Sequence, residues 1–195
     1  MPTPDDRDLT TVAAVKAWLA IPSAETGDDD LLQSLITDES VGIADLLSRP
    51  IFEATFTETY DGTAGGLLLL RVSPVKRVVE LRVGGVVIPE VRAADPGGSG
   101  FVLDGPRGVL ALRGTRFPRA PLSVTVTYVG GWDADSIPEP IRRACLSLVA
   151  FRYRGRTRIG QVSQNLAGQV VTYQQRELPL DAARLLKRYQ RVMPV

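Results

Sequence analysis

The stretch DLLSRPIFEATFTETYDG, residues 45–62, decides the fold, because the spacing of its apolar residues changes at Pro50. Before this proline, apolar residues recur every three or four positions, as they do on one face of a helix. Proline disfavours helix at the residue before it, so the helix has to end there. Beyond it, apolar residues alternate with glutamate and threonine, which predicts a half-buried strand closed by an Asp-Gly turn. The alternating apolar residues are Phe52, Ala54, Phe56 and Tyr60.

The region before this change predicts two helices. The first covers residues 10–20, is capped by Thr10 or Thr11, and ends before Pro22. The second begins at three aspartates, 28–30, which suit a helix N-terminus by capping and by charge. We disfavour a metal site at these aspartates because no liganding group recurs at the spacing of a calcium loop. The expected apolar faces are Val12, Val15, Trp18 and Leu19 in the first helix, and Leu32, Leu35, Ile36, Ile43, Leu46 and Leu47 in the second.

The region after the change predicts a series of short strands and then two more helices. Gly84 and Gly85 fit a two-residue hairpin turn, where positive φ is needed. The glycine-rich loop 95–100 lacks the lysine and the following helix of a phosphate-binding loop. Helices are expected over 137–155 and 178–192. Inward positions are expected at Leu122, Val124, Val126 and Tyr128 in the last strand, at Ile141, Cys145, Leu148 and Val149 in the first of these helices, and at Ala182, Leu185, Leu186 and Tyr189 in the second.

These elements predict an α+β fold class, a helical bundle of the N- and C-terminal helices with an inserted antiparallel β region. A chain of 195 residues fits a single domain, 1–195, that needs no disulfide to hold its core. We expect its helical core to combine residues 9–49 with 138–191. The β insertion would then cover residues 51–130.

The composition argues against an enzyme, a metal and a cofactor. The chain has no histidine and one cysteine, which removes histidine-dependent triads and cysteine-rich zinc sites. No phosphate-binding loop, dinucleotide fingerprint or nucleophile elbow occurs. The carboxylate pair Asp133 and Asp135 precedes a helix among turn residues, which favours capping over acid–base catalysis.

Nothing in the sequence indicates a membrane or a secretory route. The N-terminus lacks the basic start and apolar core of a signal peptide, and apolar runs such as 67–70 fall far below the roughly 20 residues that span a bilayer. Cys145 lies in apolar sequence and is expected to be buried rather than reactive. We therefore expect a soluble protein made in a reducing cytoplasm.

Charge is distributed very unevenly along the chain. Residues 1–60 carry 12 acidic and 3 basic side chains, whereas residues 141–195 carry 11 basic and 2 acidic ones. Both ends have periodic apolar residues, so neither is expected to be a charged tail. Attraction between the two ends, within one subunit or between copies, is the favoured explanation.

The most basic stretch, residues 151–171, raises the question of its partner. Arginines with interleaved aromatics are typical of nucleic-acid binding. However, Phe151 and Tyr153 continue an amphipathic helix, where packing into the core is the commoner role. The four arginines also cross an expected helix end at Gly155, so they need not share a face. We favour a protein interface, and we expect residues 156–178 to be extended or to order only on a partner.

Taken in order, several segments of the chain resemble the head–tail connector, or adaptor, proteins of long-tailed bacteriophages and gene transfer agents. The matching segments are DLTTVAAVKAWLAI, DDDLLQSLITDESVGIADLLSRPI, TETYDG, VTYVGGWDADSIPEPIRRACLSLVAFRYRGR and LDAARLLKRY. The resemblance implies a structural protein of the virion neck that forms a ring, commonly of twelve subunits, beneath the portal protein. Such a ring extends the DNA channel toward the tail without reading the DNA sequence, and it carries no catalytic residues.

The expected partners are other copies of the chain, the portal protein, and a stopper or tail-completion protein. The expected interface residues are Arg152, Arg154, Arg156, Arg158, Arg184, Leu185, Arg188 and Tyr189. Two alternatives remain open at this point. One is a DNA-binding or packaging accessory protein, and the other is a different neck component such as a stopper or tail-completion protein.

Overall fold

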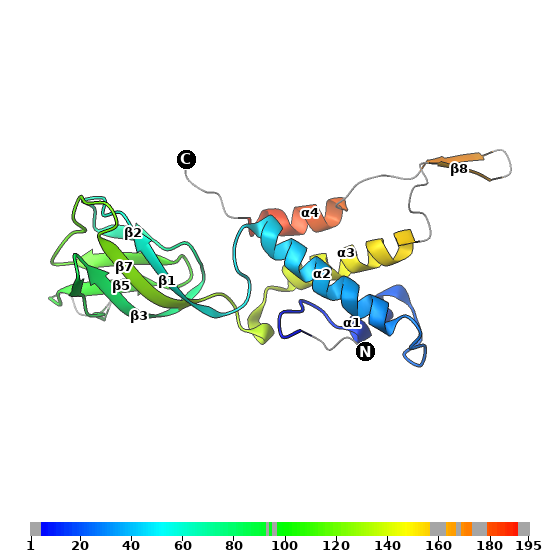
Figure 1. Ribbon diagram of the computed structural model, residues 1–195, viewed down its shortest axis with the longest axis horizontal. Coiled ribbons are helices and arrows are strands. Elements are labelled where there is room, and N and C mark those ends of the chain that lie inside the picture. Colours follow the sequence, from blue (N-terminus) through cyan, green and yellow to red (C-terminus); the bar gives the residue numbers. More distant parts are fainter. Residues whose placement is uncertain are drawn as a thin grey trace. The chain divides into compact units, whose positions relative to one another are not determined.

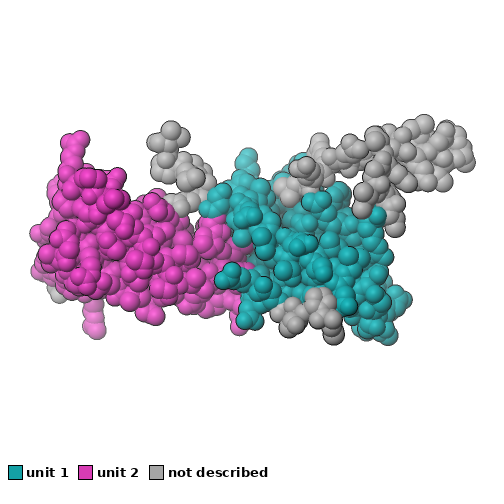
Figure 2. Space-filling model, in the orientation of Figure 1, with its two compact units in different colours: residues 1–48, 137–195 teal, residues 49–136 magenta. Residues whose placement is uncertain are grey.

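The structure, a computed structural model, describes residues 5–92, 94, 97–156, 163–166, 169–172 and 179–190. Its elements fall into two compact units (Figure 2), which are described separately. Unit 1 comprises residues 1–48 and 137–195, and unit 2 comprises residues 49–136. The expectation that residues 1–195 behave as one domain stays a prediction.

Unit 1 contains the helices α1 (Val12–Leu19), α2 (Asp29–Leu47), α3 (Glu139–Gly155) and α4 (Leu180–Lys187) (Figure 1). Thr11 caps α1 by accepting a hydrogen bond from the Ala14 backbone N–H at 3.2 Å, as expected. Helix α3 packs against each of the other three helices. A pair of short strands, β8 (Ser163–Leu166) and β9 (Gln169–Thr172), forms an antiparallel hairpin. The remainder of the stretch 157–178 lies outside the described residues.

The core of unit 1 is formed by apolar side chains at helical spacing. It contains Leu9, Val15, Leu32, Ile36, Ile43, Leu47, Ile141, Ala144, Cys145, Leu148, Val149, Ala182 and Leu186. Two residues of the expected apolar faces are exposed instead, Trp18 and Leu46. Burial raises the pKa of the Cys145 thiol to about 12, so this cysteine is buried as predicted.

Unit 2 is built from two antiparallel sheets over one hydrophobic core. The four-stranded sheet has the order β1-β7-β3-β4, and the three-stranded sheet has the order β2-β6-β5. Their strands are β1 (Ala54–Tyr60), β2 (Leu67–Leu69), β3 (Val75–Val83), β4 (Val86–Val87), β5 (Gly100–Asp104), β6 (Val109–Arg113) and β7 (Val124–Gly130). A short 3-10 helix, η1 (Ala134–Ser136), follows β7.

The alternation in sequence determines which faces of these strands are buried. In β7, Val124, Val126 and Tyr128 are fully buried, whereas Leu122, just before the strand, is exposed and lies in the left-handed region. Gly84 and Gly85 both have positive φ in the turn between β3 and β4, as the hairpin requires. The expected burial of Leu122 is therefore wrong, because the strand begins two residues later.

The expected fold class, a bundle of N- and C-terminal helices with an inserted β region, is wrong. The chain is a mixed α+β structure in which the sheets form a compact unit with a core of their own. A bundle needs helices of comparable length packed around a shared core. Here α1 and α4 have 8 residues each, and the main packing partner of α4 is α3.

Candidate interaction surface

Helix α4 has one buried side and one basic, accessible side. Ala182 and Leu186 are fully buried against the rest of unit 1. Leu185 and Tyr189 are half-buried, and Arg184 and Arg188 are exposed. The four-residue spacing of Ala182 and Leu186 places them on one face, which the contact between α4 and α3 covers. Part of the expected apolar face therefore completes the core, and the rest remains at the surface.

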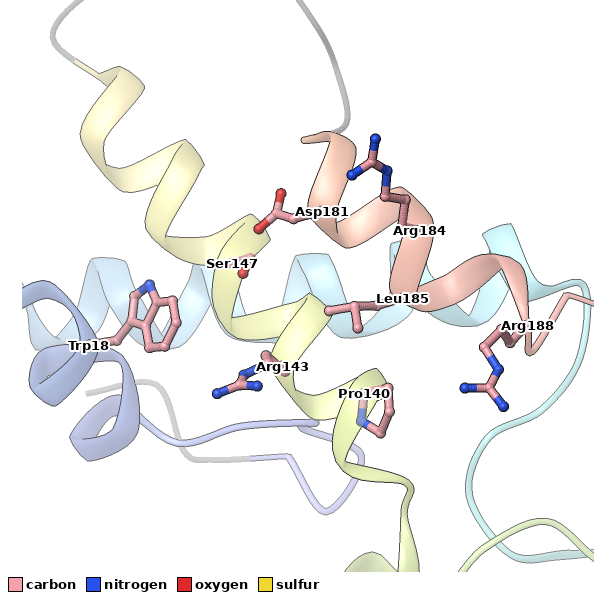
Figure 3. A pocket seen from close by; sticks show the side chains of 8 residues that line it. All are labelled: Trp18, Pro140, Arg143, Ser147, Asp181, Arg184, Leu185 and Arg188. Atoms are coloured by element: carbon pink, nitrogen blue, oxygen red, sulfur yellow. The ribbon is translucent and has the colours of Figure 1, made fainter.

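The accessible side of α4 borders a pocket of about 380 Å³, shown in Figure 3. In that view Leu185 projects from α4 toward α3, and Trp18 of α1 lies across α3 from it. The walls combine apolar groups with three guanidinium groups and one carboxylate. The lining residues are Trp18, Pro140, Arg143, Ser147, Asp181, Arg184, Leu185 and Arg188.

The exposed Trp18 is one of the pocket residues that were not among the expected interface residues. Trp18 is 49% exposed, although its helical spacing predicted a core position. Trp18 also borders a second pocket of about 300 Å³, together with residues of α1 and the first turns of α3. A large aromatic ring that is half in water and next to arginine stems is a common feature of protein interfaces.

The C-terminal end of α3 holds the arginines that were expected to form an interface. Arg152 Nε donates a 3.0 Å hydrogen bond to Glu39 of α2. Arg156 donates a 2.8 Å hydrogen bond to Asp28, and its guanidinium lies 3.8 Å from the centre of the Tyr153 ring. Arg154 is exposed, and Arg158 lies outside the described residues. Two of the four arginines thus pair with acidic residues of the same subunit.

Asp28 has a different role from the helix cap that its position predicts. It lies directly before α2 but its side chain makes no capping hydrogen bond. Its carboxylate accepts hydrogen bonds from the Tyr153 hydroxyl and from Arg156. The Tyr153 hydrogen bond, followed by that of Arg156, lowers the pKa of Asp28 and keeps it ionised. The attraction between the acidic and basic ends of the chain is therefore present inside one subunit.

The arginines of α3 and those of the pocket differ in their surroundings. Within the part of the chain that the structure describes, no carboxylate lies within ion-pair distance of Arg143, Arg184 or Arg188. The sequence grouped Arg184 and Arg188 with Arg152 and Arg156, but the structure separates them into two sets. The set around the pocket has charge available for a partner.

Other candidate sites from the sequence take structural roles. Lys76 donates hydrogen bonds to both Glu53 and Asp133, so Asp133 forms an ion pair rather than a side-chain cap, and Lys76 lowers its pKa. Among the described residues, no group of three or more histidine, cysteine or acidic side chains is arranged to hold a metal ion. No described helix is long and apolar enough to cross a membrane.

Several solved structures have a similar fold. The chain matches a protein in the virion of a native gene transfer agent particle with a TM-score of 0.58 and 21% identity, covering 100% of this chain and 95% of that one. It matches a protein in the neck of an empty gene transfer agent particle, computed with C6 symmetry, with a TM-score of 0.57 and 19% identity over 96% and 92% of the two chains. A protein in the neck of the native particle, computed with C12 symmetry, gives a TM-score of 0.54 and 20% identity over 96% of each chain.

Comparison with families gives the identity of the chain. No curated protein matches the sequence. The profile of a family described as head completion protein matches residues 8–192, nearly the whole chain. This match confirms the resemblance to head–tail connector proteins, and the chain belongs to the head completion protein family.

Proposed function

We propose that this protein is a structural component of the virion neck, a head–tail connector that forms a ring beneath the portal and extends the DNA channel toward the tail. The observation that carries this proposal is the family match over residues 8–192. The similar folds in the necks of gene transfer agent particles support the same position. The ring would have twelve subunits, and its neighbours would be the portal protein and a stopper or tail-completion protein.

The role we propose is structural and needs no catalysis. Asp133, one of the two carboxylates considered for acid–base catalysis, instead forms an ion pair with Lys76. The functional features of the chain are surfaces, namely the basic pocket at α4 and the acidic helix α2. Surfaces of opposite charge on one chain suit head-to-tail contacts, which close into a ring when the rotation allows.

Electron microscopy of particles assembled without this chain tests the proposal. We expect heads without tails, with attachment restored when the chain is supplied. The portal should still be present in these heads, because the proposed ring binds after it. Particles with normal necks and attached tails in the absence of the chain would overturn the proposal.

The alternative of a DNA-binding accessory protein has less support from the geometry. Arg152 and Arg156 are already held by the carboxylates of Glu39 and Asp28, so they are less able to neutralise phosphates. A gel shift with duplex DNA over a range of salt concentrations separates the two functions. A DNA-binding protein that neutralises several phosphates loses affinity steeply as salt rises, whereas we expect no shift at moderate salt.

A further inference from the structure

Helix α2 has an exposed stripe that is both acidic and apolar. On the face opposite its buried residues, Leu31, Ser34, Asp38, Val41 and Asp45 recur at helical spacing. Leu31 is 41% exposed and Val41 is 57% exposed. No lysine or arginine occurs between Lys16 and Arg49 in the sequence. We call these five residues the α2 stripe.

Among the described residues of its own subunit, the α2 stripe has no cationic partner. Arg152 pairs with Glu39 and Arg156 pairs with Asp28, and neither acidic residue belongs to the stripe. Among the described residues, no lysine or arginine lies within ion-pair distance of Asp38 or Asp45. The stripe thus presents unpaired carboxylates beside exposed aliphatic side chains, a surface suited to a basic and apolar partner.

The pocket beside α4 has the complementary character. Trp18, Pro140 and Leu185 give it apolar walls, and Arg143, Arg184 and Arg188 give it positive charge. An amphipathic helix that lays an apolar and charged face into such a groove is a common recognition mode. The volume of about 380 Å³ and the apolar walls suit aliphatic side chains better than a phosphate backbone.

The pocket cannot be filled by the α2 stripe of its own chain. No residue of α2 lines the pocket. The buried face of α2 packs toward α3, so the stripe on its opposite face points away from α3. The stripe and the pocket therefore lie on different faces of unit 1, as a head-to-tail contact requires.

We propose that the α2 stripe of one copy docks into the pocket lined by Trp18, Arg143, Leu185 and Arg188 of the next copy. This inference rests on the proposed ring and names the surfaces that join its subunits. Val41 and Leu31 would lie against the apolar walls, and Asp38 and Asp45 would approach the arginines. When the contact repeats around a closed ring, every α2 stripe lies in the pocket of a neighbouring copy and no stripe or pocket is left unoccupied.

Cross-linking between chosen positions tests the contact directly. Ser34→Cys or Val41→Cys supplies a thiol on the stripe, and Ser147→Cys supplies one at the pocket. Native Cys145 is buried and does not compete. A short bis-maleimide should join the double variants into a ladder of multimers, whereas mixed single variants, one of each kind, should stop at dimers. The control pairs each stripe cysteine with Thr115→Cys on the exposed surface of unit 2. A ladder of equal yield in the control, or no adduct with Ser147→Cys, would contradict the contact.

Charge reversal tests whether the contact is needed for the neck. The variants Asp38→Arg/Asp45→Arg and Arg184→Glu/Arg188→Glu should each abolish tail attachment when supplied to particles that lack the chain. Combining all four substitutions should restore attachment at least in part, because the charges are again complementary. The control Arg116→Glu/Arg119→Glu makes the charge change of the pocket variant at exposed positions of unit 2, and it should leave tail attachment unchanged.

The outcomes separate this inference from the proposed function. If tails attach normally with either charge-reversed variant, the inference is wrong and the connector function stands. If tails attach when the chain is missing altogether, the connector function itself is wrong. Loss of attachment with the pocket variant alone, without effect of the stripe variant, would assign the pocket to another protein and would overturn the inference.

Discussion

The hydroxyl of Tyr153, near the end of α3, donates a 2.5 Å hydrogen bond to the carboxylate of Asp28 at the start of α2. Arg156 donates to the same carboxylate and stacks on the Tyr153 ring. A hydrogen bond within unit 1 thus links two residues that are 125 positions apart in the sequence. The attraction expected between the acidic and basic ends takes this specific form.

The Asp28 contact predicts an acid-sensitive contribution to stability. The pKa of Asp28 is lowered in the folded protein from its ordinary value of 3.8. Its stabilising effect is therefore present above that value and is lost as the pH falls through the lowered pKa. We expect Asp28→Asn to destabilise the protein at neutral pH and to converge with wild type at acidic pH, measured by urea unfolding from about pH 2 to about pH 7. Asp30→Asn, at an exposed position in the first turn of α2, is the control. An equal pH dependence in that variant would argue against a specific role of Asp28.

Lys16 gives a second prediction, because its side chain is buried and its ammonium group donates three hydrogen bonds. It donates hydrogen bonds to the Ser23 carbonyl at 3.1 Å, the Glu25 carbonyl at 2.5 Å and the Asp29 carboxylate at 2.9 Å. Lys16→Met keeps the aliphatic stem but leaves these acceptors without a donor. We expect a loss of about 1–3 kcal/mol in the free energy of unfolding, measured with denaturant.

Lys187→Met, at an exposed position of α4, is the matched control for Lys16. It should change the free energy of unfolding by no more than about 0.5 kcal/mol. Equal effects of the two substitutions would show that the buried hydrogen bonds of Lys16 contribute nothing specific.

Cys145 gives a prediction about reactivity. Its thiol is fully buried, lies 3.7 Å from Ser40 Oγ, and has a pKa raised to about 12 by burial. Because the thiolate is the reactive form, an alkylating reagent should modify the folded protein only as fast as it opens. Labelling with iodoacetamide near neutral pH should therefore be negligible in buffer and complete in denaturant. Rapid labelling of the folded chain would contradict the buried position.

Substitution of Tyr128 gives a prediction about the stability of unit 2, and it tests whether the chain unfolds as one domain. Its hydroxyl accepts a 3.1 Å hydrogen bond from the Val72 N–H and donates a 2.7 Å one to Glu58. Tyr128→Phe leaves the Val72 N–H unsatisfied, at a cost of about 1–3 kcal/mol. If residues 1–195 form one cooperative domain, calorimetry should show a single unfolding transition. Tyr128→Phe and a substitution in the core of unit 1 should then each lower the temperature of that same transition. Two transitions that move independently would contradict the single-domain prediction.

The sequence predicted helices and strands well where the apolar residues recur with a single helical or strand period. The alternation of β7 placed Val124, Val126 and Tyr128 inside, and the spacing of α3 placed Ile141, Cys145 and Leu148 inside. These positions are buried because the period of a strand or helix puts such residues on one face. The overall arrangement was not predictable in this way, because apolar period does not reveal which distant helix covers each face. The bundle expectation failed at this step.

The surface was harder to predict than the core. Trp18 and Phe151 have core spacing but are exposed. The arginines of 152–158 were grouped because they are close in sequence. Their roles, however, depend on which acidic side chains they contact in the folded protein. Arg152 faces Glu39 and Arg156 faces Asp28, and these partners lie more than a hundred residues away. No local pattern contains that information.

Leu185 and Leu186 of α4 give the final prediction, since neighbouring leucines face different surroundings. Leu186 is fully buried, so Leu186→Ala should cost about 2–5 kcal/mol in the free energy of unfolding. Leu185 is half-buried and lines the pocket, so Leu185→Ala should cost about 1 kcal/mol or less. Self-association should follow the opposite order. Sedimentation well below the melting temperature should show near-normal association for Leu186→Ala and at least about tenfold weaker association for Leu185→Ala, as expected for loss of a central apolar contact. Equal weakening of association in both variants would show that α4 acts only through the fold and that the contact between copies lies elsewhere.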